Sequence, residues 1–262
     1  MSNGRTRGIV LHLTDHGEAD KIVTFFSPEL GRVTAIAKGA KRSRKRFVNK
    51  LEEFSLLQIM YRPARGDGLH FLSEAELENA YLPIRTHYDR YVAAMYAGEL
   101  TLRFTREHDP DPEIFTILVW TMEELAKGRD PLAVAAFFHL RLLGAAGYEP
   151  QLDRCGMCGA AVANGQDYAL HAGRGALVCA RCLSEQRGAV LPLRVQTLRV
   201  LQHAQRSELK NLSRLRLSPN NALEALHILY RYTQHLLQHD IHSWHQVRKL
   251  ATAQPPDFPP AG

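Results

Sequence analysis

The sequence predicts an α+β protein of several domains: a small β-barrel at the amino terminus, an α-helical carboxyl-terminal part, and a cysteine-rich insert. Two observations predict this order. β-Branched and aromatic runs fill the first 80 residues, whereas apolar residues recur at intervals of three and four after Glu74. All four cysteines lie between Pro150 and Gly188. The expected parts are an OB-fold at 1–80, a helical domain at 81–250, a zinc-ribbon insert at 151–187 and a disordered tail at 251–262.

Five segments near the amino terminus have the composition of strands. Each is four to eight residues long, and turn residues bound it. The run Ser27–Gly31 predicts a hairpin turn between two of them. Five strands with no helical period between them suit a small closed barrel of the OB-fold type better than a parallel sheet or a sandwich. The expected strands are residues 7–14, 21–26, 31–37, 54–61 and 69–72.

Helical periodicity follows from Tyr88 to Phe104 and continues along the rest of the chain. Asp111 before Pro112 and Asp130 before Pro131 are typical helix starts, since proline is favoured in the first turn. The helix that begins near Pro131 ends near Gly144 or Gly147. Further helices are expected at about 193–206, 220–239 and 242–250.

The cysteines form two C-x2-C pairs that are twenty residues apart: Cys155 with Cys158, and Cys179 with Cys182. Each pair can place two thiolates on one Zn²⁺ ion, which takes four tetrahedral ligands in structural sites. Because all four positions are cysteines, no position remains for the water that catalytic zinc needs. Residues 167–170 and 175–178 between the pairs predict a hairpin. The spacing therefore predicts one structural zinc ion in a zinc ribbon.

Two other interpretations of the metal-ligand residues remain open. A thioredoxin-like dithiol would have one C-x2-C next to a βαβ unit, whereas this chain has two pairs and no such unit. The histidines near the carboxyl terminus offer a second possible metal site, because His235 and His239 are one helical turn apart. A solvated helix face is the preferred interpretation of this group, which consists of His227, His235, His239, His242 and His245.

Positive charge is concentrated in one short stretch. The chain has 33 Lys and Arg against 27 Asp and Glu, and residues 38–50 alone hold seven cations and no anion. This stretch joins two predicted strands, so we expect a loop on the barrel. Such a loop repels itself unless phosphates neutralise it, and phosphate neutralisation drives non-specific nucleic-acid binding. The predicted DNA-binding residues are Lys38, Lys41, Arg42, Arg44, Lys45, Arg46 and Lys50.

A solubilising surface loop is the alternative interpretation of this stretch. Membrane binding would need an amphipathic helix or a lipidation motif beside it, and the sequence has neither. OB-folds bind single strands across one face of the barrel and its loops, where aromatic side chains stack on bases. Phe47 is the candidate for such stacking, whereas the other aromatic residues of this region, Phe25, Phe26, Tyr61 and Phe71, fit core positions of short strands.

The sequence also lacks several motifs that would indicate an enzyme, a membrane protein or a secreted protein. It lacks the motifs of nucleotide-binding loops, serine hydrolases and zinc proteases, which favours a protein that is not an enzyme. No apolar run is long enough to span a membrane, and residues 1–5 are not followed by the apolar segment of a secretory signal. We therefore expect a cytoplasmic protein.

Six short motifs follow one another in the chain: residues 36–42, 51–54, 139–143, 147–150, 152–155 and 158–159. Together they resemble the RecO family of bacterial recombination mediators. The resemblance covers nearly the whole chain and ends in the His-rich carboxyl-terminal helix and tail. It implies an OB-fold that binds single- and double-stranded DNA, a helical body and an inserted zinc ribbon. Some members of this family lack the cysteines, so their presence here favours a ribbon that folds around metal.

The resemblance also implies a function and partners. A RecO protein anneals complementary single strands and works with RecR to load RecA onto DNA coated by single-strand-binding protein. Its helical body docks the acidic tail of that protein, which needs an apolar socket and a guanidinium for the terminal carboxylate. Phe138, Arg141 and Leu142 are the expected docking residues. Alternatively, Phe138 and Leu142 pack in the core instead of lining a socket. For Arg141, pairing with an Asp or Glu of the same chain is expected more than pairing with a ligand.

A zinc-ribbon protein that binds RNA or acts in translation is the second functional hypothesis, because the same barrel and ribbon would serve it. A mediator should speed the pairing of complementary DNA strands held by single-strand-binding protein, whereas an RNA-binding protein should prefer RNA and leave that pairing unchanged.

Overall fold

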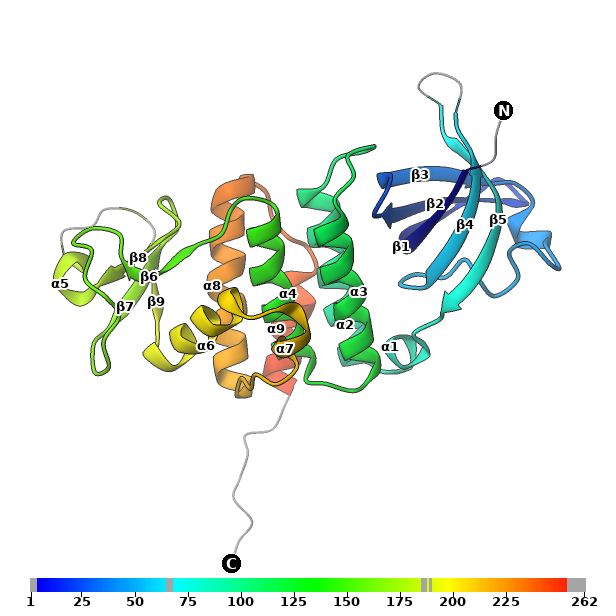
Figure 1. Cartoon of the computed structure of the whole chain (residues 1–262). Helices are drawn as coiled ribbons and strands as arrows, with labels where there is room; N and C mark the ends of the chain where they lie inside the picture. Colours follow the sequence, from blue (N-terminus) through cyan, green and yellow to red (C-terminus); the bar gives the residue numbers. More distant parts are fainter. Residues whose placement is uncertain (1–3, 65–67, 185–187, 189, 254–262) are drawn as a thin grey trace, which may run out of the picture. The chain divides into compact units, whose positions relative to one another are not determined.

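The computed structural model describes residues 4–64, 68–184, 188 and 190–253 of the chain (Figure 1). Its internal contacts divide the chain into two compact units, Met1–Gly128 and Arg129–Gly262, and each unit is described separately below. The strands give way to helices after Asn79, close to the expected end of the barrel. The expected boundaries of the OB-fold, the helical domain and the ribbon stay a prediction.

Five strands form a closed barrel in the first unit, in the order β1-β2-β3-β5-β4 (Figure 1). The pairing of β3 with β5 is parallel, and the other neighbours pair antiparallel. The pair β1–β4 closes the ring, which confirms the predicted small closed barrel. The strands are β1 (Gly4–His16), β2 (Asp20–Ser27), β3 (Gly31–Ala37), β4 (Leu56–Arg62) and β5 (His70–Asn79).

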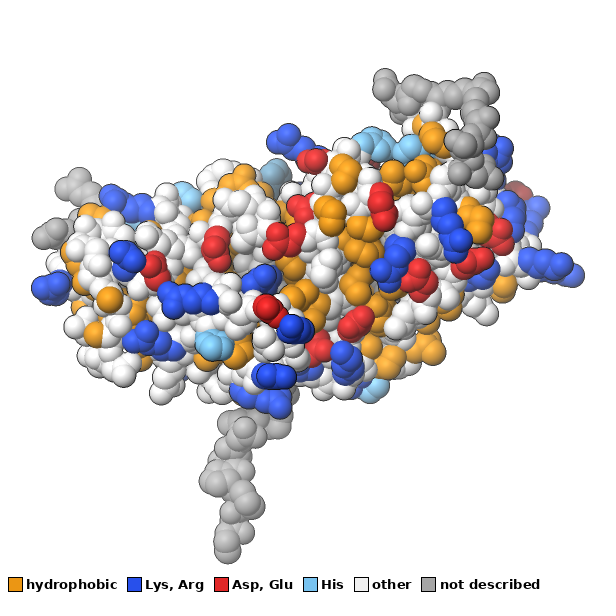
Figure 2. Space-filling view, in the orientation of Figure 1, with side chains coloured by type: hydrophobic (Ala, Val, Ile, Leu, Met, Phe, Trp, Pro, Cys, Tyr) orange, Lys and Arg blue, Asp and Glu red, His pale blue; other side chains and the backbone are white. Residues whose placement is uncertain are grey.

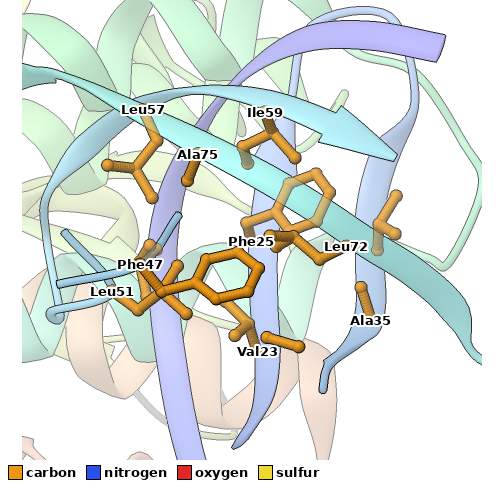
Figure 3. Packing of buried hydrophobic residues seen from close by; sticks show 12 residues of the cluster. Val23, Phe25, Ala35, Phe47, Leu51, Leu57, Ile59, Leu72 and Ala75 are labelled. Atoms are coloured by element: carbon orange, nitrogen blue, oxygen red, sulfur yellow. The ribbon is translucent and has the colours of Figure 1, made fainter. Parts of the chain in front are cut away.

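Successive side chains of a strand point alternately into and out of the barrel, and the inward apolar side chains fill its interior. Val23, Phe25, Ala35 and Leu72 point into it and belong to one buried cluster (Figure 3). Phe47 lies in the same cluster with only 3% of its surface exposed, so the prediction that Phe47 stacks on bases is wrong. Its ring closes the barrel core from the loop before β4, which periodicity in the strands could not indicate.

The described part of the first unit also contains the α-helices α1 (Leu82–Thr86), α2 (Tyr88–Phe104) and α3 (Pro112–Ala126). Asp111 caps α3 by accepting a hydrogen bond from the backbone N–H of Ile114 at 2.9 Å, as the Asp-Pro start predicts. The segment between α2 and α3 lies along the start of β3, where the N–H of His108 donates to the carbonyl of Arg32. Gly31 has a φ of 68°, and any side chain there would collide with the backbone of Asp109.

The second unit contains helices and a small sheet. The helices are α4 (Pro131–Ala145), α5 (Ala180–Leu183), α6 (Val195–Arg206), α7 (Leu209–Leu212), α8 (Pro219–Leu237) and α9 (Trp244–Ala253). Residues 251–253 are therefore helical, which corrects the expected start of the tail, and 254–262 lie outside the described residues. Among the described residues, no helix combines the length and the apolar character that crossing a membrane requires.

The sheet has four strands in the order β6-β8-β7-β9 (Figure 1): β6 (Gln151–Cys155), β7 (Tyr168–His171), β8 (Ala176–Cys179) and β9 (Val190–Leu193). The predicted hairpin is the antiparallel pair β7–β8, whereas β6 and β9 are additional strands. Two glutamine side chains of α6 hold the edge strand β6. Gln202 donates to the carbonyl of Leu152 at 2.6 Å, and Gln205 donates to the carbonyl of Pro150 at 2.8 Å.

Candidate functional site

The sheet of the second unit brings the four cysteines together. Cys155 ends β6, Cys158 follows in the next turn, Cys179 ends β8 and Cys182 lies in α5. Their Sγ atoms all lie within 4.8 Å of one another, and those of Cys158 and Cys179 are 3.8 Å apart. A Zn–S bond of about 2.3 Å places tetrahedral sulfurs about 3.8 Å from each other. The cysteines could therefore hold one metal ion.

Backbone groups favour the thiolate form of Cys155. Burial opposes ionisation of Cys155, but N–H groups of Cys158, Cys179 and Met157 lower the pKa of its thiol to about 6. The turn between the first two cysteines is tight, since the N–H of Gly159 donates to the carbonyl of Cys155 at 2.9 Å and its φ is 72°. A metal ion would need these sulfurs in the thiolate form.

Arg181 was not among the predicted site residues, although it stands between two of the cysteines in the sequence. The thiolates of Cys158 and Cys179 attract its exposed guanidinium and raise its pKa. Four thiolates around a divalent cation leave a net charge of about −2, so a nearby guanidinium stabilises the loaded site. The position of Arg181 next to Cys182 is the signal that could have indicated this role.

The carboxyl-terminal histidines do not form a comparable cluster. Within residues 4–64, 68–184, 188 and 190–253, only the four cysteines bring three or more His, Cys, Asp or Glu ligand atoms close enough to share a metal ion. His227 stacks on Trp244 with ring centroids 6.1 Å apart, and His245 lies 3.3 Å from Asp240. The five histidines are exposed, in agreement with a solvated face.

The basic stretch lies on the barrel between β3 and β4, as predicted. It begins with a short 3-10 turn at Ala40–Arg42 and continues without regular structure. The side chains of six of the seven predicted DNA-binding residues are exposed, and Lys50 is half-buried. The six are Lys38, Lys41, Arg42, Arg44, Lys45 and Arg46. The loop therefore keeps the predicted cations accessible to solvent and to a bound anion.

Part of this charge is already neutralised by the β1–β2 hairpin. The Nζ atom of Lys41 lies 2.9 Å from a carboxylate oxygen of Asp15, and Arg42 lies 3.3 Å from Glu18. The expectation that only phosphates could relieve the repulsion is thus corrected. On the face shown in Figure 2, Lys and Arg side chains likewise lie among Asp and Glu side chains on the barrel. The sequence contains no local signal for these pairs, because they depend on how the β3–β4 loop packs against the β1–β2 hairpin.

Five cations of the loop have no carboxylate partner among the described residues: Lys38, Arg44, Lys45, Arg46 and Lys50. Arg46 donates to the carbonyls of Lys38 and Ser73, and Lys50 donates to those of Lys45 and Arg46. Bonds to neutral carbonyls leave the positive charge uncompensated. These five side chains are the part of the loop with the strongest attraction for anions.

The expected docking residues lie on α4. Phe138 and Leu142 are fully buried, as is the neighbouring Phe137. Arg141 donates to the carbonyls at the end of α6, those of Ala204, Gln205 and Ser207, at 3.0–3.5 Å. Its partner is thus the carbonyl end of a helix rather than the expected Asp or Glu. No socket opens at these residues in the described part of the chain, and the docking site stays a prediction.

Comparison with known families gives two matches that together cover most of the chain. A model described as "Recombination protein O N terminal" matches residues 1–81, which contain the barrel. A second, described as "Recombination protein O C terminal", matches residues 85–245, which contain the cysteine cluster. Both matches follow the chain order that the sequence motifs indicate.

Individual proteins are similar along nearly the same length, and each of the following carries the name DNA repair protein RecO. The one from Syntrophobacter fumaroxidans is 35% identical over 216 residues, which are 82% of this chain and 85% of the relative. The one from Syntrophus aciditrophicus is 32% identical over 91% of this chain and 93% of the relative. The one from Anaeromyxobacter dehalogenans is 35% identical over 90% of this chain and 92% of the relative.

Proposed function

The chain belongs to the RecO family of DNA repair proteins, and from this premise we propose that it is a recombination mediator. It binds single- and double-stranded DNA, anneals complementary strands, and with RecR helps to load RecA onto DNA coated by single-strand-binding protein. It works by binding rather than by catalysis, in the cytoplasm and in association with the nucleoid. The described site supports this role with cations and a metal-ligand cluster.

The DNA-binding role rests on one observation above the others. Five exposed or half-buried cations of one loop have no carboxylate partner in the described structure, so phosphates can replace solvent counterions around them. Contacts of this kind do not read sequence. The loop therefore suits a protein that must bind any complementary pair of strands.

The cysteine cluster is the proposed zinc site, with Cys155, Cys158, Cys179 and Cys182 as the four ligands. The thiol-only donor set and the 3.8 Å spacing of two sulfurs fit tetrahedral Zn²⁺. Zinc would stabilise the fold of the ribbon and supply no reactive position, because its ligand shell is complete. Arg181 would offset the negative charge of the loaded site.

An annealing experiment tests the proposal. Two complementary strands are coated with single-strand-binding protein, and their pairing is followed by energy transfer between end labels, with and without RecR. The chain should speed pairing several-fold, and a variant with Arg44→Ala and Lys45→Ala should speed it less. Unchanged pairing rates together with tighter binding of RNA than of DNA would favour the RNA-binding alternative instead.

A further inference from the structure

A row of side chains crosses the outer face of the barrel. In the strand register, Ile22 of β2 lies opposite Ile36 of β3, Ile36 lies opposite Phe71 of β5, and Phe71 lies opposite Arg62 of β4. All three apolar members are half-buried, and Arg62 is exposed. The row thus spans four of the five barrel strands.

The direction of these side chains follows from their neighbours. Val23, Ala35 and Leu72, each adjacent to a member of the row, point into the barrel (Figure 3). Successive side chains of a strand point to opposite faces, so Ile22, Ile36 and Phe71 point outward. An apolar strip therefore lies on the outside of a barrel whose interior is already filled.

Arg62 covers the phenyl ring of this strip. Its guanidinium carbon lies 4.4 Å from the ring centroid of Phe71, the shortest of the cation–ring distances among the described residues. No carboxylate in the described part of the chain pairs with Arg62. A planar guanidinium that rests on a ring, without an anionic partner, can stack with a second planar group.

The row lies next to the basic loop. Lys38 directly follows the end of β3 and is two residues from Ile36, and Ser73 is two residues from Phe71 in β5. Two residues of extended chain span about 7 Å. Arg46 joins these two positions, since it donates to the carbonyls of Lys38 and Ser73. A strand whose phosphates contact the loop would thus have its bases within reach of the row.

We propose that Arg62 and Phe71 form a stacking platform for an unpaired base of single-stranded DNA. The inference rests on the proposed DNA-binding function of the barrel and names the form of DNA that this face prefers. Bases stack on aromatic rings and on guanidinium planes with little regard to sequence. The bases of a duplex are already paired and stacked, so the platform favours single strands, whereas the loop alone accepts any phosphate backbone.

The test distinguishes the contribution of the bases to binding from that of the phosphates. Binding is measured for a thymidine oligonucleotide, an abasic strand of the same length and a duplex of the same length. Arg62→Lys keeps the charge but removes the plane, so it should weaken thymidine binding by about five- to a hundredfold. Its effect on the abasic strand and the duplex should stay within roughly twofold. Phe71→Leu keeps an apolar side chain without the ring, and it should give the same pattern.

Arg7→Lys is the matched control, because Arg7 is an exposed arginine of the same unit that lies 5.9 Å from the ring of Phe115. It should bind all three ligands as the unaltered protein does. Equal losses for all three ligands with Arg62→Lys, or no loss for any, would overturn the platform and leave DNA binding by the loop intact. Failure of the unaltered protein to bind any of the three would overturn the proposed function itself.

Discussion

His139 of α4 and Thr233 of α8 are joined by a hydrogen bond of 2.7 Å between Nε2 and Oγ1, and both side chains are fully buried. Burial lowers the pKa of His139 to about 3, because the interior of the second unit disfavours the imidazolium. The imidazole is therefore neutral in the folded protein at every pH near neutrality.

This buried histidine should make the stability of the protein fall at mildly acidic pH. The unfolded chain binds a proton near pH 6.5 and the folded chain does not, so stability is complete above about pH 6.5 and is lost as the pH falls toward 3. From pH 7.5 to 5.5 the free energy of unfolding should drop by about 1.4 kcal/mol through His139. Urea unfolding measures the free energy of unfolding at both pH values. Its change from pH 7.5 to 5.5 should be larger in the unaltered protein than in His139→Gln by this amount. Identical pH profiles would contradict it.

The elements that sequence reasoning found are those with a strong local pattern. Runs of β-branched and aromatic residues between turn residues predicted the barrel strands, and Asp-Pro starts predicted α3 and α4. The strands β6 and β9 lack such a pattern, since Gln151–Cys155 is mostly polar and Pro192 interrupts β9. Proline can occupy β9 because that strand lies at the edge of its sheet.

The parts of the candidate site that could be predicted are those whose residues lie close together in the sequence or follow a known metal-ligand spacing. The two C-x2-C pairs predicted the cluster that the structure brings together, and the charge run located the basic loop. The partners of Lys41 and Arg141 were not predictable, because they lie 26 and 63 to 66 residues away and depend on tertiary contacts. Phe71 could not be assigned to core or surface without the strand register, and Phe47 could not be assigned without the fold of the loop before β4.

Arg141 should contribute mainly to stability. Arg141→Met keeps most of the apolar stem but leaves the carbonyls at the end of α6 without their charged donor, so we expect a loss of about 1.5–3 kcal/mol in unfolding free energy. Arg154→Met, at an exposed ion pair with Asp153, is the control and should cost well under ~1 kcal/mol. Unaltered stability combined with weaker binding of the acidic tail peptide of single-strand-binding protein would favour the docking role instead.

The zinc proposal predicts one ion per chain. Protein purified without a chelator should contain one zinc ion per chain by elemental analysis. The Cys182→Ser variant should contain less zinc. Metal binding at such a site contributes on the order of 10 kcal/mol to folding of the local module. Hydrogen exchange should therefore rise in β6, β7 and β8 of the variant and stay unchanged in the barrel strands. Zinc-free protein with full protection of those strands would remove the proposal.

The cations of the basic loop should contribute unequally to the salt dependence of DNA binding. If the five without carboxylate partners contact phosphates, the slope of log affinity against log salt for a single strand should be about −3.5, at ~0.7 per phosphate. Arg44→Ala with Lys45→Ala should flatten that slope by about 1.4. Lys41→Ala with Arg42→Ala should flatten it less, because Asp15 and Glu18 already neutralise these two side chains. Titrations by fluorescence anisotropy at several salt concentrations measure both slopes. A loss of affinity at constant slope would mean that Arg44 and Lys45 act on the shape of the loop rather than on phosphates.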